Sequence, residues 1–247
     1  MGNELSKLFV AIGIQDAEFH KGLKGIEQKM RTVGANMTKI GAGITAAVGL
    51  IGGASLKMAA DFDSAMREVN TMMLLNEAEF QSFSAEIREM STTMGVDAVD
   101  SAKALYQAIS AGVPRENVIE FLQVATKAAI GGVTETTTAV DGLTTVLNAF
   151  KLPISDAQKV ADFMFTTIKG GKTTFEELSA SLFNVAPIAA ASNVEFEEVA
   201  AALAAMTQQG VPTAQATTQL RQAFVALQKP TAEMQTMLDG MGWASGQ

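Results

Sequence analysis

Hydrophobic residues near the start of the chain first alternate with other residues and then follow a seven-residue repeat. Apolar side chains occupy every second position from Leu8 to Ile14, which predicts a short strand in a leader of residues 1–15. From Phe19 onward they are spaced alternately four and three residues apart, as in a coiled-coil seam. The seam consists of Phe19, Leu23, Ile26, Met30, Val33, Met37, Ile40 and Ile44.

This spacing predicts one long helix over residues 16–75 that pairs with a helix of another copy through its narrow apolar seam. The alternative is a helix of a globular domain, which usually carries a wider apolar face. The register shifts by one residue at Phe62 and then continues through Met66 and Val69. These residues extend the apolar face toward the end of the predicted helix.

An uncharged stretch, residues 40–56, lies inside the predicted long helix. Small residues recur there at every fourth position, a spacing that allows two helix backbones to approach closely. They are Gly41, Thr45, Gly49 and Gly53. The stretch is also near the shortest length that spans a bilayer. Three interpretations stay open, namely a close contact between chains, entry into a membrane, and burial within a folded domain.

From residue 76 the pattern changes to shorter amphipathic helices that are separated by glycine and proline. Asn76 and Glu79 fit a capping box, which predicts a helix start at that point. The following helices are expected over Ala98–Ala111, Arg115–Ile130, Glu135–Phe150, Asp156–Lys169, Phe175–Ala191, Phe196–Gln209 and Ala214–Gln228. The fold is therefore expected to be all-α, with a compact domain of helical hairpins over residues 76–235 and a disordered or truncated tail over 236–247.

Two segments of this helical region resemble each other. Ala104-Leu105 leads to Gly112-Val113-Pro114 in the same way that Ala202-Leu203 leads to Gly210-Val211-Pro212, at an offset of 98 residues. A similarity at so large an offset indicates a duplicated helical unit rather than a solenoid of short repeats.

The composition restricts the possible functions. The formal net charge of −8 makes specific nucleic-acid binding a poor expectation. The chain has no cysteine, which excludes disulfides and thiolate metal sites. Its only histidine, His20, has no partner residues that would suggest a metal site or a catalytic base. We therefore predict neither an enzyme nor a cofactor or metal site.

One glycine-rich segment resembles part of a phosphate-binding loop. Gly170-Gly171-Lys172-Thr173 matches the end of that motif, but Thr166 occupies the position of its first glycine and no strand is expected before it. The segment is better interpreted as a helix end followed by a new helix start.

Five blocks of residues occur in an order that resembles phage tail tape measure proteins of the minor-tail family. The resemblance spans Ala60 to about Met234, and the leader Leu8–Ile14 with Phe19 is also similar to the usual start of these proteins. The blocks are Phe62–Val69, Gly95–Gly112, Leu147–Leu152 with Ala157–Phe163, Phe175–Pro187, and Glu198–Gly210 with Ala216–Leu227.

The resemblance implies a structural role without chemistry. Such proteins lie in the growing tail tube, set tail length and leave the virion at genome ejection. The implied partners are further copies of the chain, the tail tube protein, tail assembly chaperones and tail tip proteins, with assembly in the host cytoplasm. The family's long central repeats and C-terminal parts are missing, and the chain stops in the glycine-rich Asp239–Gly242. A fragment, a split gene product or a degenerate prophage copy is therefore expected.

Two other function classes compete with this expectation. A membrane-active protein would use residues 40–56 to enter or perforate a bilayer, including the host membrane at ejection. The other class is an enzyme, such as the cell-wall hydrolase that larger tape measure proteins sometimes carry, but the histidine, cysteine and carboxylate residues of this segment do not suggest a catalytic site.

Overall fold

The computed structural model describes the backbone of residues 44–240 and the side chains of residues 57–237, 239 and 240. Its contacts divide the chain into two units, Met1–Lys57 and Met58–Gln247. The predicted strand at Leu8–Ile14 and the predicted helix up to residue 43 lie outside the described residues. The coiled-coil seam therefore stays a prediction.

Every regular element among the described residues is a helix, which confirms the all-α class for this part of the chain. The helices are α3 (Ile44–Met73), α4 (Glu77–Met94), α5 (Ala98–Ser110), α6 (Val118–Gly132), α7 (Thr136–Ala149), α8 (Ala157–Gly170), α9 (Phe175–Ser179), α10 (Ala186–Ala191), α11 (Phe196–Gln208), α12 (Thr213–Gln228) and α13 (Ala232–Gly240). Two short 3-10 helices, η1 (Ile154–Asp156) and η2 (Leu182–Asn184), lie between them.

Most helix boundaries agree with the sequence pattern to within a few residues. The capping box before α4 is confirmed, since the Asn76 side chain accepts from the Glu79 backbone N–H and the Glu79 carboxylate accepts from the Asn76 N–H. The later part of the predicted register is also confirmed. Phe62, Met66 and Val69 of α3 are almost fully buried.

The prediction of one helix over Phe175–Ala191 is wrong. The structure divides this segment into α9, η2 and α10. Pro187 provides the physical reason, because it has no N–H to donate and its ring clashes with a preceding helical carbonyl. It lies in the first turn of α10, where proline is tolerated.

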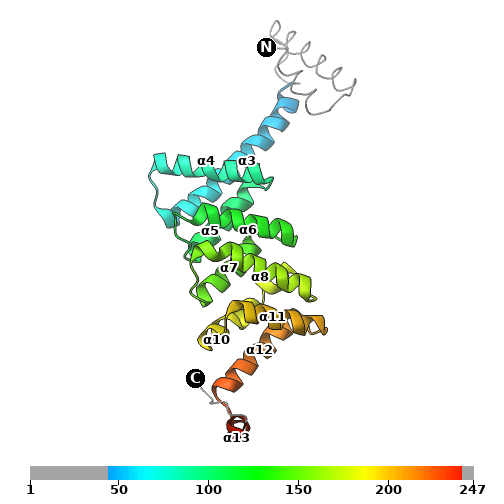
Figure 1. Cartoon of the computed structure of the whole chain (residues 1–247). Coiled ribbons are helices and arrows are strands. Elements are labelled where there is room, and N and C mark those ends of the chain that lie inside the picture. Colours follow the sequence, from blue (N-terminus) through cyan, green and yellow to red (C-terminus); the bar gives the residue numbers. More distant parts are fainter. Residues whose placement is uncertain (1–43, 241–247) are drawn as a thin grey trace. The chain divides into compact units, whose positions relative to one another are not determined.

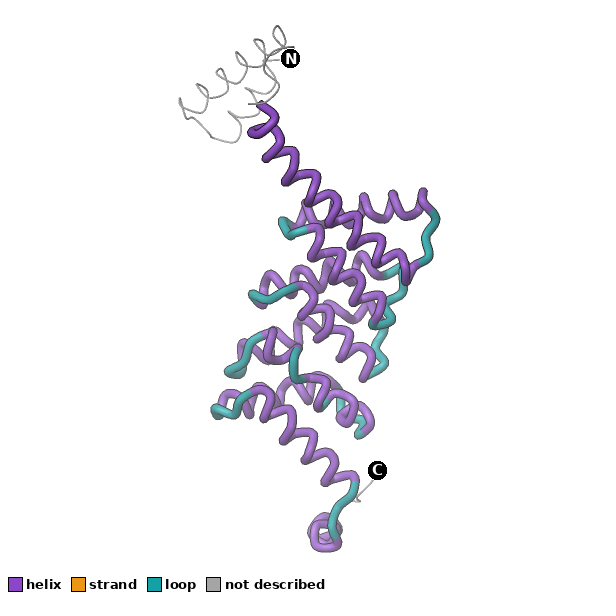
Figure 2. Tube along the Cα trace, turned by 180° about the vertical axis from the view of Figure 1, so that it is seen from behind, coloured by secondary structure: helices purple, strands orange, loops and turns teal. Residues whose placement is uncertain are grey.

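The core of the Met58–Gln247 unit forms around α7. This helix packs against α5 and α6, which precede it in the sequence, and against α8, α9 and α10, which follow it. Leu143 and Val146 are completely buried there. Figure 1 shows the helices from α4 to α12 following one another in layers, and Figure 2 shows the same order from behind.

The 98-residue offset seen in the sequence is a structural repeat. α5 and α11 have the same length, and a glycine with φ of 92°, Gly112 or Gly210, lies two residues beyond the end of each. The Val113 N–H donates to the Ala108 carbonyl, and the Val211 N–H donates to the Met206 carbonyl, again 98 residues apart. Both helices thus end in the same hydrogen-bonded turn.

The repeat extends well beyond the hairpin that the sequence indicated. Phe62, Met66 and Val69 of α3 are buried, and so are Val160, Met164 and Thr167 of α8, which lie 98 residues further on. We call residues 59–156 the first module and residues from 157 onward the second module. Residues 98 positions apart are called counterparts.

A polar contact is also repeated between the modules. Arg115 donates to the Glu79 carboxylate at 3.3 Å in the first module. Their counterparts are in contact too, since the Thr213 hydroxyl donates to the Glu177 carboxylate at 2.9 Å. The contact joins α4 to the turn before α6 in the first module, and α9 to the start of α12 in the second. The donor is a charged guanidinium in the first module and a neutral hydroxyl in the second.

The two modules meet where α7 of the first approaches α9 of the second. A Cβ atom added at Gly142 would lie 2.8 Å from the Ser179 Cβ and 3.1 Å from the Ser179 Cα. Glycine is therefore required at this position by the close approach of the two backbones.

Candidate interaction surface

The predicted self-association residues are not placed by the structure. Phe19, Leu23, Ile26, Met30, Val33, Met37 and Ile40 lie outside the described residues, as does Gly41. Ile44, Thr45, Gly49 and Gly53 lie in the helical backbone of α3, but their side chains are not described. The seam and the close-packing stretch therefore stay predictions.

The membrane interpretation of residues 40–56 stays a prediction. Among the described residues, no helix combines the length and the apolar character needed to cross a bilayer.

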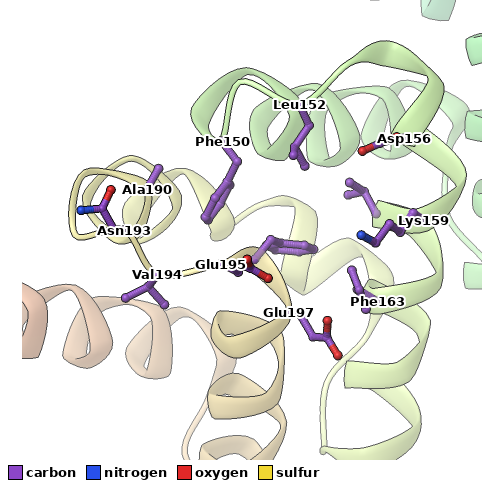
Figure 3. A pocket seen from close by; sticks show the side chains of 12 residues that line it. Phe150, Leu152, Asp156, Lys159, Phe163, Ala190, Asn193, Val194, Glu195 and Glu197 are labelled. Carbon is purple, nitrogen blue, oxygen red and sulfur yellow. The ribbon is translucent and has the colours of Figure 1, made fainter.

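A groove of about 360 Å³ lies beside the junction of the two modules and is lined by both aromatic and charged side chains. Phe150 comes from the end of α7, Phe163 from α8 and Phe196 from the start of α11. The Phe196 ring makes edge contacts with the other two, at centroid distances of 5.7 Å to Phe150 and 6.3 Å to Phe163. Figure 3 shows Phe150 and Leu152 pointing into this groove.

Charged side chains surround the aromatic floor of the groove. Asp156, Glu195 and Glu197 line it together with one cation, Lys159, whose Nζ lies 5.6 Å from the Phe163 ring centroid. The Glu195 backbone N–H donates to the Glu198 carboxylate, which caps α11. An aromatic floor with a mostly acidic rim suits an apolar side chain that is flanked by basic residues.

The lining of the groove holds no histidine, serine or threonine that could act as a nucleophile or a relay. Across the described residues, no group of three or more carboxylate or histidine side chains could hold a metal ion.

The glycine-rich segment before α9 has a structural role. The Lys172 backbone N–H donates to the Thr207 hydroxyl, and the Thr174 hydroxyl accepts from the Glu177 N–H at the start of α9. Thr173 and Thr213 are hydrogen-bonded to each other at 2.7 Å. The polar groups of this segment therefore join α8, α9, α11 and α12.

The groove was not predicted from the sequence. Phe150, Phe163 and Phe196 each fall within or beside an expected helix, but they are separated by 13 and 33 residues. The counterparts of Phe163 and Phe196 are the alanines Ala65 and Ala98, so the repeat does not indicate the cluster either. Only the packing of three elements brings these rings together.

Comparisons with known proteins identify a matching family and two relatives. The sequence model of a family described as phage-related minor tail protein matches residues 84–246. The chain is 35% identical over 181 residues to the probable tape measure protein of Clostridium phage phiCD119, an alignment that covers 71% of this chain and 19% of that protein.

A second relative is more distant. The tape measure protein of Pneumococcus phage Dp-1 is 25% identical over 215 residues, which cover 85% of this chain and 19% of that protein. The chain thus spans about a fifth of the length of the curated relatives that it matches. No solved structure matches the chain significantly.

Proposed function

This chain belongs to the phage-related minor tail protein family, and we propose that it acts as a helical scaffold segment of a phage tail tape measure protein. The observation that carries the proposal is the 35% identity to a probable tape measure protein over 71% of the chain. In this role the chain takes part in assembly of the tail tube, in setting tail length and in genome ejection.

The architecture of the described residues supports a scaffold. Its helices form two modules with a continuous packed core. Burial of apolar side chains along such a stack gives a stiff body without the need for ligands. The groove at Phe150, Phe163 and Phe196 is the candidate site for a tail partner, because Phe150 and Phe163 are partly exposed in it.

The proposed partners are the tail tube protein, the tail assembly chaperones, the tail tip proteins and further copies of the chain. Self-association through the predicted seam is part of the proposal. A double substitution, Leu23→Asp with Met30→Asp, would put two carboxylates into the seam and lower the oligomeric state measured by sedimentation. Full oligomerisation of this variant would contradict the role of the seam.

Deletion of the gene in the phage tests the function directly. Lysates of the deletion phage are expected to lack tails of uniform length when they are examined by electron microscopy. Wild-type protein supplied in trans should restore the tails. A Leu143→Asp variant should fail to do so, because it puts a charge into the core beside α5 and α6.

A matched control separates folding from function. Gln222→Asp adds the same charge at an exposed position of α12 and should restore tails as well as the wild type does. Normal tail number and length in the deletion phage would overturn the proposal. Restoration by Leu143→Asp would show that the folded helical body is not needed for the function.

A further inference from the structure

The repeat that relates the two modules continues into α13, which corresponds in sequence to the start of α7. Residues 135–142 read Glu-Thr-Thr-Thr-Ala-Val-Asp-Gly, and residues 233–240 read Glu-Met-Gln-Thr-Met-Leu-Asp-Gly. The glutamate, the third threonine, the aspartate and the glycine are identical. α13 is therefore the counterpart of α7 by position in the repeat and by its own residues.

The two helices differ in their packing. α7 lies against α5 and α6 along its length, whereas α13 makes no comparable contact with α11 or α12. Figure 1 shows α13 beyond the end of α12 rather than alongside it. Ala139 of α7 is fully buried, while its counterpart Met237 is 68% exposed.

The surface that α13 would need is present and uncovered. Val118, Leu122 and Ala125 of α6 are completely buried. Their counterparts on α12 are less covered toward the end of the helix, since Ala216 is buried, Leu220 is half-buried and Ala223 is exposed. Leu227 is 44% exposed, whereas its counterpart Ala129 is buried. We call Leu220, Ala223 and Leu227 the outer α12 face.

We propose that the outer α12 face is the docking surface for α13, which packs on α11 and α12 as α7 packs on α5 and α6. Docking removes Met237 and the outer α12 face from water together, and apolar burial is the driving force for such packing. The second module then has the same helix arrangement as the first. The proposal does not depend on the tape measure function.

A second copy of the chain fits the same surface less well. At the junction between the modules, Phe165 lies against Gly131, and a Cβ atom added at Gly131 would be 3.1 Å from its ring. The counterparts of these two residues are Arg67 and Lys229. A second copy that repeated this junction would bring the two cations together without the aromatic contact, which disfavours head-to-tail stacking.

Thiol reactivity tests the proposal in the full chain, which contains no cysteine of its own. Ala223→Cys and Met237→Cys each place one thiol on the proposed contact. Arg221→Cys is the control, since Arg221 and its counterpart Gln123 are both exposed. Docking should make the two contact thiols react with a maleimide at least about tenfold more slowly than the control thiol, as expected for a site that opens by local unfolding.

A charged substitution in α13 tests whether this helix is the one that covers the outer α12 face. In the Ala223→Cys background, Met237→Asp should abolish the protection, because the carboxylate resists burial. Glu233→Lys should leave it unchanged, because Glu233 and its counterpart Glu135 are exposed. Circular dichroism checks that each variant keeps its helices.

Two results would overturn the proposal. Contact thiols that react as fast as the Arg221→Cys control would show that α13 stays undocked. Protection that grows with protein concentration would show that a second copy, rather than α13, occupies the outer α12 face.

Discussion

The first and second modules share many buried positions but end in different surfaces. In the first module, Arg67 and Glu77 are exposed, and Arg67 is paired with Asp63 at 2.7 Å. Their counterparts in the second module are Phe165 and Phe175, whose rings are 5.3 Å apart. The same two positions are thus charged and exposed in the first module, and aromatic and at the module junction in the second.

This difference shows how two copies of a duplicated unit can be adapted to different positions in a stack. Terminal units of a stacked protein need a polar outer side, whereas internal units need an apolar one. The side of the first module that carries Arg67 has the character of a terminal surface. The outer α12 face of the second module is apolar and is covered by α13 in our proposal, so the two ends of this stack differ in chemistry.

Two deletions of 98 residues would sharpen this contrast and should have the largest effects. Removal of residues 97–194 joins Val96 to Glu195 and keeps the charged side of the first module. Removal of residues 59–156 joins Met58 to Ala157 and leaves Phe165 and Phe175 uncovered. We expect the first deletion to give a helical monomer and the second to aggregate, since exposed apolar patches drive association.

Circular dichroism and sedimentation would measure the outcome of both deletions. The helix content per residue and the monomeric state of the 97–194 deletion are the critical values. Equal behaviour of the two proteins would contradict the idea that only one side is terminal in character.

A methyl group at the module junction should have the next largest effect. Gly142→Ala forces the Ser179 backbone away from α7, and we expect a loss of about 2 kcal/mol in the free energy of unfolding. Its counterpart Gly240 has open space around the same position, so Gly240→Ala should cause no loss. Urea denaturation of both variants measures the difference, and equal losses would argue against a close junction.

One connecting turn holds a residue that does not suit its backbone. Val133 joins α6 to α7 with a φ of 52° and is 90% exposed. A β-branched side chain is strained in this left-handed region, so Val133→Gly should raise the free energy of unfolding by about 1 kcal/mol. The same change at Val225, an exposed residue of α12, should lower it. Thermal melts of the two variants should therefore shift in opposite directions.

The smallest expected effect concerns the repeated polar contact. The Asn76 backbone N–H, with a further contribution from Arg115, lowers the pKa of Glu79 below its usual value. Because the folded pKa is the lower one, this contribution to stability is present above the unfolded pKa of about 4.3 and is lost as the pH falls through the folded pKa.

Glu79→Gln should therefore reduce the pH dependence of stability in the acidic range and change little near neutral pH. Denaturation midpoints between acidic and neutral pH provide the measurement. An unchanged acidic slope in this variant would contradict the assigned role of Glu79 at the start of α4.

Local signals were sufficient for most of the secondary structure. The capping residues Asn76 and Glu79 and the glycines Gly112 and Gly210 act through hydrogen bonds and φ angles within a few residues, so their effects can be predicted from the sequence. The interruption by Pro187 is equally local, but the periodic apolar pattern of the segment led to the prediction of one continuous helix. The family resemblance was confirmed by the matching family and relatives.

Long-range packing decided the rest. The sequence by itself determined that helices form, where most of them end, and that a hairpin recurs at 98 residues. Only the tertiary structure revealed that the repeat covers whole modules, that Phe150, Phe163 and Phe196 converge, and that Arg67 faces outward where Phe165 is covered. These features depend on which helix faces pack together in space. Helical periodicity shows which face of a helix is apolar, but not which other helix packs against that face.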